Sequence, residues 1–168
     1  FFPEDGEFLD QIQSNLFYAL DHAKLTNTDD VVFYSKELFA QKKYMTRLKE
    51  AIRECVEEDC KGFRIVMQPI VETKSEVCDA AEVLLRFTHP EFGVIGPMDF
   101  IPILENSKEI IRVGKWVIDQ SLQTLARWRE QIGHMPLKRL QINVSYVQFK
   151  DPELLGYVVE RLDHYQLP

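Results

Sequence analysis

Long apolar runs are missing from this sequence, and so is the basic excess of a protein that binds nucleic acid. No stretch approaches the length of a membrane span and no signal-peptide pattern is present, so we expect a cytoplasmic location, although a parent protein could be attached to a membrane through another region. The formal net charge of −7 argues against a nucleic acid polymer as partner, because such partners need a basic surface. A small anionic ligand is compatible with this charge, since one arginine or metal ion can outweigh it locally.

Cysteine is scarce too. Cys55, Cys60 and Cys78 are odd in number and lack the spacing of metal ligands, which favours free thiols in a reducing compartment. The four histidines are scattered, and we assign no catalysis to them. What is present, 45% hydrophobic and 28% charged residues, is typical of a folded domain.

The first part of the chain predicts two helices and one strand. Apolar residues recur at helical spacing from Phe8 to Leu20, and residues 31–34 have strand composition. One helix and one strand cannot bury both of their faces, so we interpret residues 1–38 as the end of a larger domain. Residues 39–61 predict an amphipathic, charged helix, suited to joining two domains or to pairing with another helix in a homodimer.

From residue 62 the pattern becomes strand, strand, helices, strand, helix. Phe63 to Glu72 and Val77 to Phe87 flank a polar turn and predict an antiparallel hairpin, with a loop at 89–93. Pro97 predicts the start of one helix, and Ser107 predicts the cap of a long helix that ends near Ile132 and Gly133. A strand is predicted from Lys138 to Ser145, and a last helix starts at Asp151. The hairpin followed by strand–helix alternation predicts an α/β fold with a parallel sheet.

Four polar residues on these strands are candidates for chemistry. Glu82 and Arg86 share one strand face, about 13 Å apart at ~3.3 Å per residue, and are either two contacts to one extended ligand or solvent-facing charges of an edge strand. Asn143 and Ser145 share a face at the C-terminal end of the third strand, where sites form in α/β folds. An amide oxygen beside a carboxylate suits Mg²⁺ or Mn²⁺, although Asn at a strand end is also a common turn residue.

Several motifs occur together in one order. They are Gln68-Pro69-Ile70-Val71, Glu82-Val83-Leu84-Leu85-Arg86-Phe87, His89-Pro90, Gly93-Val94-Ile95-Gly96-Pro97, Phe100-Ile101-Pro102, Gly114-Lys115-Trp116-Val117 and Ile142-Asn143-Val144-Ser145-Tyr146-Val147-Gln148. With them, residues 62–168 resemble the N-terminal part of an EAL domain, the cyclic di-GMP phosphodiesterase family. The signature Glu-Ala-Leu is Glu82-Val83-Leu84 here, and Phe87 stands where the family usually has Trp.

This resemblance implies roles for four residues. Glu82 and Asn143 resemble metal ligands of a two-metal Mg²⁺ or Mn²⁺ site, Arg86 resembles a contact to a substrate phosphate, and Gln68 resembles a substrate-pocket residue. The implied reaction is hydrolysis of cyclic di-GMP to a linear dinucleotide. The implied fold is an incomplete TIM-type (β/α) barrel, because a full barrel takes about 250 residues and the family's further acidic ligands fall after Pro168. We therefore expect little activity from this chain by itself.

The N-terminal segment carries a second resemblance. Residues 15–24 and 31–34 resemble the last helix and strand of a GGDEF domain, which implies a GGDEF–EAL tandem protein without an assignable cyclase site in this chain. Two alternatives to the enzyme stay open: a non-catalytic cyclic di-GMP receptor, and an interaction or dimerisation module built on the long helices.

Overall fold

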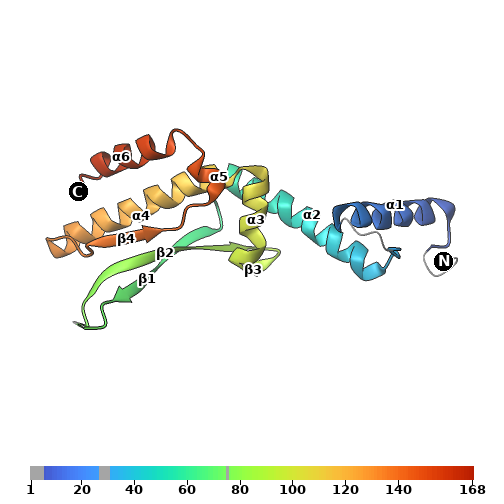
Figure 1. The fold of residues 1–168 in the computed structure, drawn as a ribbon, viewed down its shortest axis with the longest axis horizontal. Coiled ribbons are helices and arrows are strands. Elements are labelled where there is room, and N and C mark those ends of the chain that lie inside the picture. The colour runs from blue at the N-terminus through green and yellow to red at the C-terminus, as the bar shows by residue number, and fades with distance from the viewer. Residues whose placement is uncertain (1–5, 27–30, 75) are drawn as a thin grey trace. The chain divides into compact units, whose positions relative to one another are not determined.

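The computed structural model describes residues 6–26, 31–74 and 76–168, and the chain divides into two compact units, Phe1–Glu50 and Ala51–Pro168 (Figure 1). Within the described residues, no helix combines the length and the apolar character needed to cross a bilayer.

The first unit is built from α1 (Leu9–Thr26) and the start of α2 (Lys36–Glu57). The ring of Tyr18 meets Phe39 edge-on, with centroids 4.7 Å apart, and Lys42 forms an ion pair with Asp21. Helix α2 begins three residues before the predicted start at residue 39.

The strand predicted at 31–34 is wrong, because residues 31–35 have no regular structure. Strand composition alone does not make a strand: the backbone N–H and C=O groups need a partner strand. No strand pairs with this segment among the described residues, and Val31 and Phe33 are 79% and 65% exposed. The predicted turn at 26–30 lies mostly outside the described residues; Thr26 belongs to α1.

The second unit holds a mixed sheet. Its strands are β1 (Phe63–Val71), β2 (Cys78–His89), β3 (Gly93–Ile95) and β4 (Arg139–Ile142). β1 pairs with β2 in the predicted antiparallel hairpin. On the other edge of β2, β4 runs parallel to its first half and β3 runs antiparallel to its end. The predicted loop at 89–93 is shorter than expected, because its two ends pair as strand.

Helices α3 (Pro97–Ser107) and α4 (Ile110–Ile132) pack against the strands of this sheet. Helices α5 (Tyr146–Phe149) and α6 (Leu154–His164) pack against α4 (Figure 1). Pro97 and Gly133 mark helix ends as predicted. Ser107 is not the cap of α4: it lies in the last turn of α3, and Glu109 occupies the cap position. Asp151 precedes α6, and its carboxylate accepts a hydrogen bond from the backbone N–H of Glu153 at 3.0 Å.

Alternation along β2 decides which face is core. Ala81, Val83 and Phe87 are buried, whereas Glu82 and the other even-numbered residues from 82 to 88 are half-buried or exposed. The fully buried ring of Phe87 stacks on Phe63, with centroids 4.3 Å apart. Burying a phenylalanine stabilises the fold by about 1.5–3 kcal/mol, so the Phe87 side of β2 belongs to the core. The even-numbered side is the accessible one, and it is called the open face below.

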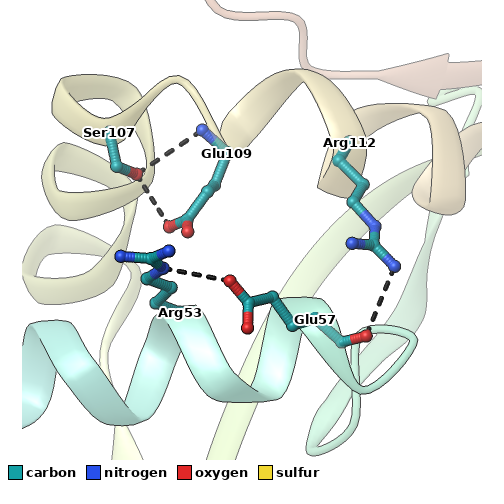
Figure 2. Close-up of polar contacts among 5 residues, drawn as sticks. All are labelled: Arg53, Glu57, Ser107, Glu109 and Arg112. Carbon is teal, nitrogen blue, oxygen red and sulfur yellow. Dashed lines mark hydrogen bonds and ion pairs between the residues drawn. The ribbon is translucent and has the colours of Figure 1, made fainter.

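The end of α2 is tied to the junction of α3 and α4 (Figure 2). Arg53 Nε pairs with Glu57 Oε1 at 3.0 Å, and Arg112 Nη2 donates to the carbonyl of Glu57 at 3.4 Å. Ser107 Oγ donates to the carboxylate of Glu109 at 2.8 Å and accepts from the Glu109 N–H at 3.4 Å. A guanidinium at the carbonyl end of α2 complements the negative end of the helix dipole.

Candidate functional site

Glu82 and Asn143 are in direct contact. The parallel register places Glu82 opposite Gln141 and Val83 opposite Ile142, so Asn143 follows just beyond the end of β4. The Asn143 Nδ2 donates a hydrogen bond to Glu82 Oε1 at 2.7 Å. Two residues that are 61 positions apart in the chain therefore present a carboxylate and an amide to one point on the open face.

Gln68 belongs to the same face. In the hairpin register it lies directly opposite Glu82, and residues opposite each other in an antiparallel pair point to the same side. Gln68 is exposed. The three residues Gln68, Glu82 and Asn143 thus follow one another across β1, β2 and the end of β4.

Arg86 is not brought into contact with these three. It lies four residues beyond Glu82, about 13 Å along β2, and its Nη1 donates to the carbonyl of Leu85 at 2.9 Å. A cavity of about 330 Å³ reaches both Arg86 and Asn143, and apolar side chains from β2, α3 and α4 form most of its wall. A larger cavity of about 710 Å³ between β4, α4 and α6 contains none of the four predicted site residues.

The loop after Asn143 is held by a reciprocal cap that the sequence analysis missed. Ser145 Oγ accepts from the Gln148 N–H at 3.4 Å, and the Gln148 side chain accepts from the Ser145 N–H at 3.0 Å. The signal was readable, since Ser-x-x-Gln is the pattern of a capping box. Gln148 is buried against Gly114, where a β-carbon would lie 1.7 Å from its amide nitrogen, so this approach requires glycine at position 114.

Lys115 fixes the next segment. Its ammonium group lies 3.1 Å from Asp151 Oδ2 and 3.0 Å from Glu153 Oε2. The Glu153 N–H and then Lys115 lower the pKa of Asp151, and hydrogen bonds from Lys115 to Glu153 and Asp151 raise the pKa of Lys115. These contacts join α4 to the start of α6 just after the loop that carries Asn143.

The donor chemistry of the contact suits a hard divalent cation. Carboxylate and amide oxygens are ligands that Mg²⁺ and Mn²⁺ accept, and Glu82 and Asn143 carry one of each. In the contact it is Asn143 Nδ2 that faces Glu82 Oε1, so the amide has to turn its oxygen toward an ion shared with the carboxylate. No group of three His, Cys, Asp or Glu side chains comes together anywhere in the described ranges. Glu82 and Asn143 are candidate ligands for such an ion.

The family model of the EAL domain matches residues 46–168, which cover the whole sheet and every residue of the candidate site. The chain belongs to the EAL domain family. This confirms the resemblance that the motifs predicted for residues 62–168 and extends it into α2.

Relatives of this EAL chain include the bifunctional diguanylate cyclase/cyclic di-GMP phosphodiesterase MucR of Pseudomonas aeruginosa, 26% identical over 99% of this chain and 24% of MucR. The cyclic di-GMP phosphodiesterase PA2567 of the same species is 32% identical over 63% of this chain and 18% of its own length. The chain spans about a quarter of the first curated relatives that it matches.

Solved structures agree with the fold. The PaMucR phosphodiesterase in its c-di-GMP complex has a TM-score of 0.65 and 28% identity, over 72% of this chain and 47% of that one. The cAMP-bound form of the EAL enzyme Bd1971 has a TM-score of 0.63 over 98% of this chain and 41% of that one; at 24% identity it supports the fold alone. The mixed α/β unit therefore corresponds to part of an EAL structure.

Proposed function

We propose that this chain is part of a cyclic di-GMP signalling protein that hydrolyses cyclic di-GMP to a linear dinucleotide. The observation that carries the proposal is the 2.7 Å contact between Glu82 and Asn143 on the open face of an EAL sheet. Support also comes from the names of the relatives, of which MucR and PA2567 are cyclic di-GMP phosphodiesterases.

Each of the four residues has a role in this proposal. Glu82 and Asn143 would hold Mg²⁺ or Mn²⁺ through their oxygen atoms, in keeping with the metal dependence typical of the family. Divalent ions promote phosphodiester hydrolysis by lowering the pKa of water and neutralising phosphate charge. Arg86 would donate charge-assisted hydrogen bonds to a phosphate oxygen, and Gln68, beside Glu82, would orient the dinucleotide.

The domain organisation is also a proposal. We divide the chain into a GGDEF remnant (1–38), an interdomain helix (39–61) and the N-terminal part of an EAL domain of TIM-barrel type (62–168). The boundary between the two compact units, after Glu50, and the start of the family match at residue 46 both fall within α2, which supports a joining role for this helix. MucR, whose name includes a cyclase, matches 99% of the chain and so covers the first segment as well.

The test is a hydrolysis assay with cyclic di-GMP and Mg²⁺ or Mn²⁺, run on residues 1–168 and on the longest protein that contains them. We expect turnover in the longer protein, a loss of a hundredfold or more in Glu82→Gln, and no change in Glu130→Gln, an exposed acid on α4. Binding without turnover, measured by calorimetry, would make the protein a receptor. If neither occurs, light scattering on the chain decides whether a dimerisation role remains.

A further inference from the structure

Two arginines stand side by side on the open face of the hairpin. The register pairs Arg64 of β1 directly with Arg86 of β2, as it pairs Gln68 with Glu82 four residues away. Directly opposed residues of an antiparallel pair have β-carbons about 4.5–5.5 Å apart and point to the same side. Arg64 therefore lies on the candidate-site face, at the end where β2 leads toward the loop before β3.

This placement is unfavourable without an anion. Like charges directly opposite each other destabilise a strand pair. Among the residues that the structure describes, neither guanidinium forms an ion pair with a carboxylate; Arg86 uses one N–H on the carbonyl of Leu85, and its other four donors are free to bind a ligand. Arg64 is exposed. Two cations gathered without a counter-charge, on a chain of net charge −7, form a local site for a negatively charged group.

We propose that Arg64 and Arg86 together form a phosphate subsite that recognises the second phosphate of a cyclic dinucleotide. This inference rests on the proposed function and deepens it. Because Arg86 lies about 13 Å along β2 from Glu82, the pair is displaced from the metal-ligand end of the face. A cyclic dinucleotide carries two phosphodiesters joined through single riboses, a shorter span than the distance between the two backbone positions. One can lie at Glu82 and Asn143 while the long arginine side chains reach back along the strand to clamp the other.

The consequence is selectivity for ligands with two phosphates. Binding energy from a part of the substrate that does not react can position the part that does. A mononucleotide offers one phosphate and can occupy one end of the face at a time. Arg64 is thus a specificity-determining residue, whereas the sequence motifs predicted Arg86 alone.

The experiment measures cyclic di-GMP affinity by calorimetry on the full chain in EDTA, which excludes turnover and metal. Arg64→Gln and Arg86→Gln should each weaken binding about tenfold or more, the effect of one lost charge-assisted contact. Arg64→Lys should fall between the wild type and Arg64→Gln, because Lys keeps the charge but not the two-pronged geometry. GMP affinity should change much less in Arg64→Gln than cyclic di-GMP affinity does.

Arg139→Gln is the matched control. Arg139 is exposed and pairs with Ala80, so it is an arginine on the same sheet, six residues along β2 from the position of Arg86. It removes the same charge and should leave affinity unchanged. The melting temperature of Arg64→Gln should equal or exceed that of the wild type, because a like-charge pair is relieved; a structural role would lower it.

Equal loss in Arg139→Gln, or no loss in Arg64→Gln, would overturn the subsite. If the wild type binds no cyclic di-GMP in EDTA, the hydrolysis assay on the longer protein decides the proposed function separately, and a titration with pyrophosphate decides the subsite. Pyrophosphate binding that disappears in Arg64→Gln and persists in Arg139→Gln would support the arginine pair as an anion site. Absence of pyrophosphate binding to the wild type, or equal binding to Arg64→Gln, would overturn it.

Discussion

The amide nitrogen of Asn143 donates a 2.7 Å hydrogen bond to the carboxylate of Glu82, joining the end of β4 to the middle of β2. This contact makes the neutral side chain at 143 a partner of the carboxylate even without a metal. Replacing the amide at position 143 by a carboxylate therefore tests the charge interaction between these two side chains.

We expect Asn143→Asp to reverse the sign of this interaction. Two carboxylates at hydrogen-bond distance repel each other, which raises the pKa of one of them. The variant should be less stable than the wild type by about 1 kcal/mol at pH 7, the value of one hydrogen bond, and should recover on acidification or on addition of Mg²⁺. Thermal melts across pH 4–8, with and without Mg²⁺, measure this.

The control is Asn143→Ala, which removes the hydrogen bond without adding charge. Its melting temperature should change with pH as that of the wild type does. A melting curve for Asn143→Asp that ignores both pH and Mg²⁺ would contradict the placement of the two side chains.

Gly114→Ala should destabilise the second unit. A β-carbon at 114 would lie 1.7 Å from the Gln148 amide nitrogen, so the buried side chain must move and its bond to the Ser145 N–H is strained or lost. Overpacking of this kind costs about 1–3 kcal/mol. Chemical denaturation gives the free energy of unfolding directly.

Gly156→Ala provides the comparison, since Gly156 also lies in a helix but a β-carbon there meets nothing within 4 Å. That variant should be more stable by about 0.5–1 kcal/mol, because alanine loses less backbone entropy in a helix. Similar values for the two glycine variants would mean that the contact with Gln148 is not close.

Lys115→Met should lower stability and flatten its dependence on acid pH. The Glu153 N–H and Lys115 hold the pKa of Asp151 below its ordinary value, so the stability that Asp151 contributes is present above that value and is lost as pH falls through the folded pKa. Without Lys115, the protein loses less stability as the pH falls. Urea melts from pH 2.5 to 6 show the change in slope.

Lys138→Met is the control that shows whether loss of any ion pair changes the stability and its dependence on acid pH. Lys138 pairs with Asp79 at 3.0 Å, but its side chain is 80% exposed, against 24% for Lys115. Solvent screening makes such exposed pairs weak. The urea midpoint should therefore move less in Lys138→Met than in Lys115→Met. A larger shift in Lys138→Met would be the contrary result.

The cysteines should differ in reactivity. Cys78 is exposed, whereas burial raises the pKa of the Cys60 thiol to about 11. At pH 8 a thiol reagent should label one cysteine quickly, and Cys78→Ser should remove that fast phase. Because the folded pKa of Cys60 lies above its ordinary 9.0, its contribution to stability should be lost between about pH 9 and 11, and Cys60→Ala should lack this loss.

Local signals in the sequence were enough for much of the second unit. Period-2 alternation gave the hairpin and the buried face of β2, and Gly133 ended α4 as predicted, because these signals act over a few residues. The strand at 31–34 failed because a strand depends on a partner elsewhere in the chain. Strand β3 was missed because three residues are too few for alternation to show.

The site could be predicted in part for the same reason. Alternation placed Glu82 and Arg86 on one face and Asn143 at the end of the third strand, and the motif order added Gln68. Their arrangement needed the strand register, which no local pattern contains: the contact of Glu82 with Asn143 follows from the parallel pairing, and Arg64 looks like an ordinary exposed charge until it is paired with Arg86.

Strand β2 has neighbours along both edges, and this has a consequence for the order in which the unit assembles. β1 and β2 are joined by a short turn, whereas β4 reaches β2 only after α3 and α4 have been formed in between. Closing the longer loop costs more chain entropy, so the hairpin should fold before β4 docks. The Glu82–Asn143 contact then exists only in the finished fold, and a partly folded chain would not yet bring these two side chains together.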